Sequence, residues 1–316
     1  MATVMPSPFD TVVLDGGLAT ELGAHGHDLS DRLWSARLLL TDPAAIEAVH
    51  LAYYEAGAQV ATTASYQATV EGFAAAGLDR DEALALIRRS AELAGRARER
   101  ARDTLGEDAD RPRLVAGSVG PYGAMLADGS EYRGDYDPGR EVLADFHRPR
   151  IEALVEAGAD LLAIETIPTV REAEVVVELL DDVDVPAWLS YSCRDGATTS
   201  AGEPIADAVT LGDHPRVMAV GVNCTAPRHL PDLLVAAGTA TRKPLIAYPN
   251  RGDRWDPTGR QWLADDDGRY DPAAVASWTS LGARWLGGCC GTGPDDIAAL
   301  VAALERVDGV EGSGAP

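Results

Sequence analysis

Short apolar runs alternate along the chain with longer segments whose apolar residues recur at helical spacing. Eight of the short runs have the near-continuous apolar character of strands buried on both faces of a parallel sheet. These runs and their immediate exits are residues 11–14, 59–63, 114–121, 160–164, 187–191, 217–222, 244–248 and 283–288. Because eight strands that alternate with helices close into a parallel barrel, the pattern predicts a single (β/α)8 TIM barrel.

The intervening segments carry the start and stop signals of helices. A proline follows Asp42 at the first helical position of one segment, and Gly57 and Gly158 stand where glycine ends a helix. The other helices are predicted over residues 79–103, 140–157, 170–180, 230–240, 272–281 and 295–307. We therefore treat residues 1–316 as one domain, with loose termini at about residues 1–8 and 308–316.

Two carboxylates stand directly after predicted strands. In a TIM barrel, residues at the carboxyl ends of the strands build the active site. Asp15 follows the first strand, where it either binds a ligand or forms the Asp-Gly turn that its sequence also suits. Glu165 follows four buried apolar residues, and a buried charge requires a partner. That partner is either a cationic side chain of the fold or a cationic ligand.

Three cysteines also follow predicted strands. Cys289 and Cys290 are adjacent, and the surrounding glycines allow the backbone to bring both sulfurs to one point. A disulfide between neighbours is strained, so two thiolates favour a soft tetrahedral ion, most plausibly zinc. Cys224 follows the sixth strand and would be the third ligand, leaving the open fourth position of a catalytic zinc. The alternative is that these cysteines are small buried apolar residues.

Other possible ligands are less well placed. His25 and His27 lie in a glycine-flanked loop, where histidines are usually solvated, so we do not assign them to a metal. Cys193 follows the fifth strand, but nothing in the sequence groups it with the other three cysteines. A closed site with four cysteines is a minor alternative to the open one.

Composition narrows the class of partner and the compartment. The net charge is −23, and Lys243 is the only lysine, so nucleic acid and anionic membranes are poor partners. The first ten residues lack the pattern of a signal peptide, and no apolar run is long enough to cross a membrane. Four cysteines in 316 residues do not form a disulfide scaffold. We expect a cytoplasmic protein that acts on small molecules as a monomer or small homo-oligomer.

Three motifs together resemble the homocysteine S-methyltransferase family. They are DGGLATEL at residues 15–22, GVNC at residues 221–224 and GGCCGT at residues 287–292. The resemblance covers about residues 9–307, and the pair GVNC and GGCCG at this separation is highly specific. Residues 33–36, 63–67 and 248–250 resemble the branch of the family that uses S-methylmethionine as methyl donor. The betaine-using branch differs after the fourth strand and carries a long C-terminal extension that is absent here.

The resemblance implies a role for several residues. Cys224, Cys289 and Cys290 would bind zinc, and Asp15 and Glu165 would hold the amino acid part of homocysteine. Gly16, Gly17, Thr63 and Ser65 would line the same pocket. Trp34 and Tyr66 would face the donor, with Asn250 nearby.

The expected reaction is zinc-dependent methyl transfer from a sulfonium donor to the thiol of homocysteine, which gives methionine. S-adenosylmethionine and betaine are the alternative donors. A zinc hydrolase is disfavoured because its metal is usually held by histidine and carboxylate, and no strand end here carries histidine. A zinc-stabilised binding protein without catalytic activity is the non-enzyme alternative.

Overall fold

The computed structural model describes residues 5–7, 10–29, 33–106, 111–252, 254–256, 261–263 and 270–311. Its main sheet has eight parallel strands in the order β1-β10-β7-β6-β5-β4-β3-β2. The strands are β1 (Val12–Val13), β2 (Val60–Thr62), β3 (Leu114–Val119), β4 (Leu161–Ile167), β5 (Ala187–Tyr191), β6 (Val217–Asn223), β7 (Leu245–Tyr248) and β10 (Ala283–Leu286). A parallel bridge between Leu14 and Val60 joins the two ends of this order, so the sheet closes into the predicted barrel.

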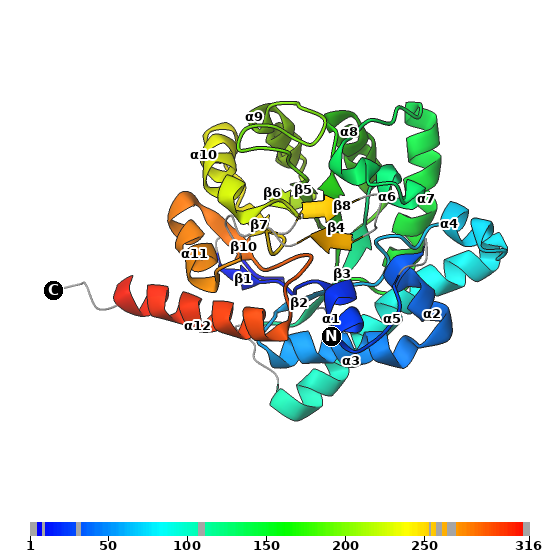
Figure 1. Ribbon diagram of the computed structural model, residues 1–316, viewed down its shortest axis with the longest axis horizontal. Coiled ribbons are helices and arrows are strands. Elements are labelled where there is room, and N and C mark those ends of the chain that lie inside the picture. The colour runs from blue at the N-terminus through cyan, green and yellow to red at the C-terminus, as the bar shows by residue number, and fades with distance from the viewer. Residues whose placement is uncertain are drawn as a thin grey trace.

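Helices surround the strands on the outside of the barrel (Figure 1). The longer ones are α3 (Pro43–Glu55), α5 (Arg80–Leu105), α7 (Arg140–Glu156), α8 (Val170–Leu179), α10 (Leu230–Ala240) and α12 (Pro294–Glu311). The shorter α-helices are α1 (Leu18–Ala24), α2 (Leu38–Thr41), α4 (Val70–Ala75), α6 (Tyr122–Leu126), α9 (Ile205–Ala208) and α11 (Pro272–Ser277). Short 3-10 helices complete the connections: η1 (Trp34–Arg37), η2 (Ser130–Tyr132), η3 (Leu180–Asp182), η4 (Val209–Asp213), η5 (Pro227–His229) and η6 (Trp278–Leu281).

Successive side chains along each strand point alternately into the barrel and toward the helices, so the core has an inner and an outer part. Val12 and Leu14 belong to the apolar cluster inside the barrel, whereas Val13 packs in the cluster between strands and helices. The inner cluster contains Trp188 and Trp285, whose ring centroids are 5.8 Å apart in an edge-on arrangement. These large side chains fill the barrel, so a ligand can be held only at its ends.

The helix ends follow the predicted signals. Asp42 accepts a hydrogen bond from the backbone of Ala45 and caps α3, and Asp79 forms a reciprocal capping box with Glu82 at the start of α5. Gly57 and Gly158 have positive φ angles of 98° and 84°, as expected for glycines that end helices and turn the chain into the next strand.

The structure also contains elements that the sequence pattern did not predict. The main ones are the short helices α1, α4, α6 and α9 in the loops and an antiparallel pair formed by β8 (Arg254–Asp256) and β9 (Gln261–Leu263). Helix α12 continues to Glu311, beyond the predicted end at residue 307, since one glycine costs a helix only about 1 kcal/mol. Most of the predicted loose N-terminus, residues 1–4 and 8, and residues 312–316 at the other end lie outside the described ranges. Among the described helices, none combines the length and apolarity needed to span a bilayer.

Candidate active site

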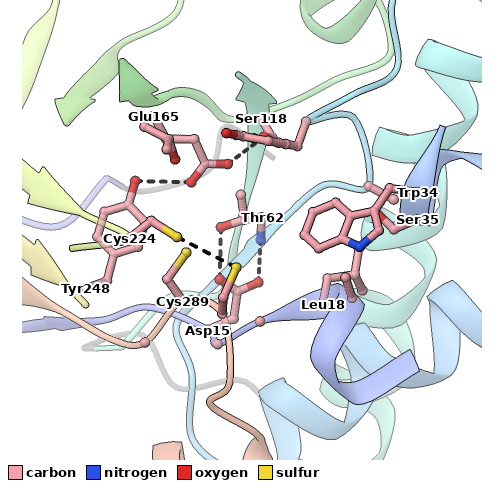
Figure 2. Close-up of a pocket in the computed structure, with 18 of the residues that line it drawn as sticks. Asp15, Leu18, Trp34, Ser35, Thr62, Ser118, Glu165, Cys224, Tyr248 and Cys289 are labelled. Atoms are coloured by element: carbon pink, nitrogen blue, oxygen red, sulfur yellow. Dashed lines mark hydrogen bonds between the residues drawn. The ribbon is translucent and has the colours of Figure 1, made fainter. Parts of the chain in front are cut away.

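One pocket collects the polar residues that follow the strands (Figure 2). Its walls come from the exits of β1, β2, β3, β4, β6, β7 and β10, the C-terminal ends of the barrel strands. The lining residues are Asp15, Gly16, Gly17, Leu18, Ala19, Trp34, Ser35, Thr62, Thr63, Ala64, Tyr66, Ser118, Tyr132, Glu165, Thr166, Cys224, Tyr248, Gly288, Cys289 and Cys290. The candidate site therefore lies where the barrel fold predicts it.

Three cysteine sulfurs converge on one side of this pocket. The Sγ atoms of Cys224 and Cys290 are 3.6 Å apart, and those of Cys224, Cys289 and Cys290 all lie within 4.8 Å of one another. Strands β6 and β10 both pair with β7, which explains how residues so distant in sequence meet. Thiolates around a tetrahedral ion with metal–sulfur bonds of about 2.3 Å would be roughly 3.8 Å apart. The donor set therefore fits a soft tetrahedral metal ion.

The protonation of the three thiols supports this fit. Hydrogen bonding from Cys289 and Cys290 lowers the pKa of Cys224 well below its usual range. Hydrogen bonding to Cys224 raises the pKa of both Cys289 and Cys290. Three buried thiols this close together cannot all ionise unless a cation offsets their charge, which a bound metal ion would do.

The turn that carries Cys289 and Cys290 has no room for side chains larger than hydrogen at its glycines. A Cβ atom on Gly288 would lie 2.1 Å from the hydroxyl oxygen of Thr292. Gly291 has a positive φ of 86°, and a Cβ there would lie 2.5 Å from the Cβ of Arg251. The glycines that the sequence analysis linked to the cysteine pair are therefore required by close packing and by backbone conformation.

Asp15 is buried beside the cysteines, with 4% of its surface exposed. Thr62 donates to both of its carboxylate oxygens, from the backbone nitrogen at 2.7 Å and from the hydroxyl at 2.9 Å. Burial nevertheless raises the pKa of Asp15 to about 8, and the charge of Glu165 adds to this rise. Asp15 forms no ion pair within the described ranges, so a cation that entered the pocket would stabilise its charged form.

Glu165 is the second buried carboxyl group of the pocket. Its oxygens accept hydrogen bonds from the hydroxyls of Ser118 at 2.5 Å and Tyr248 at 3.1 Å, as Figure 2 shows. Burial raises the pKa of Glu165 to about 7, against the effect of these two hydrogen bonds. The sequence left open whether a cationic side chain neutralises Glu165. Among the described residues none forms an ion pair with it, and the charge of Arg150 lowers its pKa only as the smallest of the contributing effects.

Strained backbone is concentrated at the same pocket. Within the described ranges, four non-glycine residues have positive φ angles, and three of them line the pocket: Trp34 at 50°, Thr166 at 59° and Cys224 at 44°. The backbone nitrogen and hydroxyl of Thr166 are both bonded to the Asn223 side chain, which fixes the turn after β4 against the end of β6. Conformations of this kind cost about 1–3 kcal/mol each and cluster at functional sites.

The structure places most of the other predicted site residues in the pocket. Gly16, Gly17, Thr63, Trp34 and Tyr66 line it, and the rings of Trp34 and Tyr66 meet edge-on with centroids 6.3 Å apart. The other two predicted residues, Ser65 and Asn250, do not line the pocket but form hydrogen bonds to residues that do. The hydroxyl of Ser65 donates to the carbonyl of Ser118, and the side-chain nitrogen of Asn250 donates to the carbonyl of Cys224.

Residues without an assignment in the sequence analysis remain outside the cluster. Cys193 is not part of the three-cysteine group, and its backbone nitrogen bonds to the hydroxyl of Thr225. His25 is an exposed residue directly after α1 and pairs with Glu21 of that helix. Neither contributes to a metal site among the described residues.

The polar residues that sequence reasoning missed include four with a hydrogen bond to Asp15, Glu165 or Cys224: Thr62, Ser118, Tyr132 and Tyr248. Three of them stand in or near strand ends that the analysis had identified, so a fuller search of strand exits would have found them. Tyr132 could not be found in this way, because it lies in the long loop after β3, 92 residues before Cys224. Its hydroxyl is 3.5 Å from the sulfur of Cys224.

A buried ionic network supports the loop that carries Tyr132. The Glu172 carboxylate accepts hydrogen bonds from the backbone of Tyr122 at 2.6 Å, from Nε2 of His147 at 2.8 Å and from the hydroxyl of Tyr136. Arg150 donates to the carbonyl of Tyr66, which lines the pocket, at 2.9 Å. The network therefore fixes the exits of β2 and β3 relative to each other.

The fold and the site define a TIM-barrel enzyme whose active site combines a three-thiol cluster with buried carboxyl groups. Comparison with known proteins agrees with this class. A sequence profile described as homocysteine S-methyltransferase matches residues 12–304. The homocysteine S-methyltransferase of Escherichia coli K12 is 49% identical over 297 residues, which cover 93% of this chain and 95% of the relative. The selenocysteine Se-methyltransferase of Brassica oleracea var. italica is 45% identical over 301 residues, covering 91% and 87%.

Solved structures give the same result. The oxidized and metallated forms of the homocysteine methyltransferase MmuM from Escherichia coli match with TM-scores of 0.84 and 0.82. Both are 48% identical in sequence, and each match covers 93% of this chain and 96% of the other. The chain belongs to the homocysteine S-methyltransferase family, and it is a methyltransferase.

Proposed function

We propose that this enzyme transfers a methyl group from S-methylmethionine to the thiol of homocysteine, with zinc held by Cys224, Cys289 and Cys290. The observation that carries the proposal is the convergence of these three sulfurs beside two buried carboxyl groups that form no ion pair with any described residue. The thiol cluster suits a metal that activates a thiol, and the carboxyl groups suit the ammonium group of an amino acid.

Zinc bound by three thiolates keeps one position for a further ligand and lowers the pKa of a thiol that occupies it. A free thiol has a pKa near about 8.5, so at neutral pH little of it would otherwise be the nucleophilic thiolate. The residues of the chain have a positioning task. Asp15 and Glu165 bind the ammonium group of homocysteine and thereby aim its side chain at the cysteine cluster.

The transfer itself needs no proton donor. An electron pair of the homocysteine thiolate forms the new bond to the methyl carbon, and the carbon–sulfur bond of the sulfonium breaks. Its electrons remain on the donor sulfur, which leaves as a neutral thioether. With S-methylmethionine as donor, both products are methionine. This balance agrees with the described lining of the pocket, which contains no histidine.

The donor side of the pocket suits a positive charge. Trp34 and Tyr66 present aromatic rings to it, and an aromatic face attracts a cation through its quadrupole. None of the lining residues within the described ranges is a lysine or arginine, so no cationic side chain among them opposes the charge of a sulfonium. The pocket should therefore bind a donor with a positive charge better than one with a negative charge.

A panel of methyl donors at fixed homocysteine tests the proposal. We expect the highest kcat/KM with S-methylmethionine, and two molecules of methionine formed for each donor consumed. S-adenosylmethionine and betaine should give lower values at equal concentration. Methionine formation should be followed by mass spectrometry, with a methyl-labelled donor to trace the transferred group. If none of the donors gave methionine, the proposed function would be refuted. A preference for betaine would refute the assignment of a sulfonium donor.

A further inference from the structure

A chain of hydrogen bonds connects the interior of the barrel with Glu165 in the pocket. The indole nitrogen of Trp188 donates to the hydroxyl oxygen of Tyr248 at 2.9 Å, and this hydroxyl donates to Oε2 of Glu165 at 3.1 Å. The hydroxyl of Ser190 lies 2.7 Å from the same Tyr248 oxygen. Trp188 and Ser190 are fully buried, and neither is among the residues that line the pocket. The fold thus connects two residues away from the pocket to a group that we propose to bind substrate.

The chemistry of these groups fixes the direction of the hydrogen bonds. An indole N–H can only donate, so Trp188 occupies one lone pair of the Tyr248 oxygen. An ionised carboxylate can only accept, so the hydrogen of the Tyr248 hydroxyl points to Glu165. The hydroxyl of Ser190 then donates to the second lone pair of the Tyr248 oxygen. Every position around this oxygen is filled, and the Tyr248 hydroxyl remains a donor toward Glu165.

The side chain of Tyr248 is held in place by several elements of the barrel. It starts at the end of β7, lines the pocket and reaches Glu165 of β4, as Figure 2 shows. Because β6 lies between β7 and β5 in the sheet, the side chain must extend across the barrel to bond with residues of β5. Its ring also meets that of Trp188 edge-on, with centroids 6.1 Å apart. Tyr248 therefore cannot turn away from Glu165 without losing its contacts with Trp188.

The other carboxylate oxygen of Glu165 is held by a second fixed hydroxyl. Ser118 donates to Oε1, and the backbone of Ser118 is bonded on both sides. Its nitrogen donates to the hydroxyl of Thr63 at 2.9 Å, and its carbonyl accepts from the hydroxyl of Ser65 at 2.7 Å. Hydroxyl groups from β3 and β7 thus hold both oxygens of Glu165. The orientation of the carboxylate is set before a substrate enters, which reduces the entropy lost on binding.

We propose that Tyr248 is a positioning residue for the acceptor substrate, and that Trp188 contributes to acceptor binding from inside the barrel by holding the Tyr248 hydroxyl as a donor to Glu165. The inference rests on the proposed function, in which Glu165 binds the ammonium group of homocysteine. It adds that the strength of this binding depends on a hydroxyl and on an indole N–H that need not touch the substrate.

The first test is Tyr248→Phe, which keeps the aromatic ring and removes only the hydroxyl. We expect kcat/KM for homocysteine to fall about 30-fold, because a hydrogen bond to a charged group is lost. The KM for the methyl donor and the zinc content should stay the same. In a Glu165→Gln background the same change should cost less than about threefold, since no carboxylate is left to position. Tyr191→Phe is the matched control, because its buried hydroxyl donates to the carbonyl of Ala208 and it does not line the pocket.

The second test compares two tryptophans of the same apolar cluster. Trp188→Phe removes the N–H that holds Tyr248, and we expect kcat/KM for homocysteine to fall about fivefold, as for a hydrogen bond between neutral groups. Trp285→Phe is the matched control. Trp285 is equally buried and packs against Trp188, but its indole nitrogen has no hydrogen-bond partner among the described residues. Both variants lose similar packing, so the difference between them isolates the N–H. Thermal unfolding of each variant measures the cost of the lost packing.

Three results would overturn the inference and leave the proposed methyl transfer intact. One is an unchanged kcat/KM for homocysteine in Tyr248→Phe, and another is an equal loss from this change with and without Glu165. The third is an equal effect of Trp188→Phe and Trp285→Phe, which also decides the case if Tyr248→Phe does not fold. A wild-type enzyme that transfers no methyl group to homocysteine from any donor would overturn the proposed function and the inference together.

Discussion

Replacing Cys290 with alanine is expected to abolish stable metal binding and to reduce methyl transfer by at least about 1,000-fold. The variant leaves two thiols, and a catalytic zinc site of this type requires three protein ligands. Without the metal, the acceptor thiol remains mostly protonated at neutral pH. Zinc content should be measured by plasma mass spectrometry on protein that was purified in the presence of zinc, and transfer should be measured on the same samples.

Cys193→Ala is the matched control for this experiment. It makes the same chemical change at the one cysteine outside the cluster. We expect it to retain one zinc per chain and full activity. A Cys290→Ala protein with normal zinc content and normal transfer would show that the cysteine cluster has another role.

The second large effect is expected from Asp15→Asn. The asparagine can keep both contacts with Thr62, by accepting from its backbone nitrogen and donating to its hydroxyl, so the fold should be preserved. The variant cannot carry the negative charge that we propose for binding the ammonium group of homocysteine. We expect the KM for homocysteine to rise about 100-fold, which corresponds to roughly 2.7 kcal/mol. Zinc content and the KM for the donor should change little.

Steady-state kinetics with each substrate varied in turn would measure this effect. Asp184→Asn serves as the control, because the side chain of Asp184 is fully exposed. If Asp15→Asn raised the KM for the donor instead, Asp15 would have to be assigned to the binding site of the donor and not to that of homocysteine. An unchanged KM for both would show that Asp15 has only the turn-forming role that the sequence also allowed.

Much of the site could be predicted because a barrel converts chain order into spatial order. Eight apolar runs fix the order of the strands, and each strand exit then lies at one end of the barrel. This is why Cys224 could be placed with Cys289 and Cys290 although 65 residues separate them, since 289 − 224 = 65. The same rule placed Asp15 and Glu165 in the pocket.

The parts that could not be predicted lie in the loops. Glu131 and Tyr132 belong to a connection whose path over the barrel mouth depends on tertiary contacts, such as the bond from Ser192 to the carbonyl of Glu131. The hydroxyl partners of Glu165 come from β3 and β7, and no local pattern indicates which hydroxyl faces which carboxyl group. The positive φ angles of Thr166 and Cys224 are likewise imposed by the fold, because neither residue favours that conformation.

The proposal depends on a metal held by three cysteines that accepts the sulfur of homocysteine as a fourth ligand. X-ray absorption at the zinc edge of the wild-type protein tests this point most directly. The account predicts three sulfur ligands and one oxygen or nitrogen ligand before homocysteine is added, and four sulfur ligands afterwards. A spectrum with four sulfur ligands from the start, or one with three that homocysteine leaves unchanged, would contradict it.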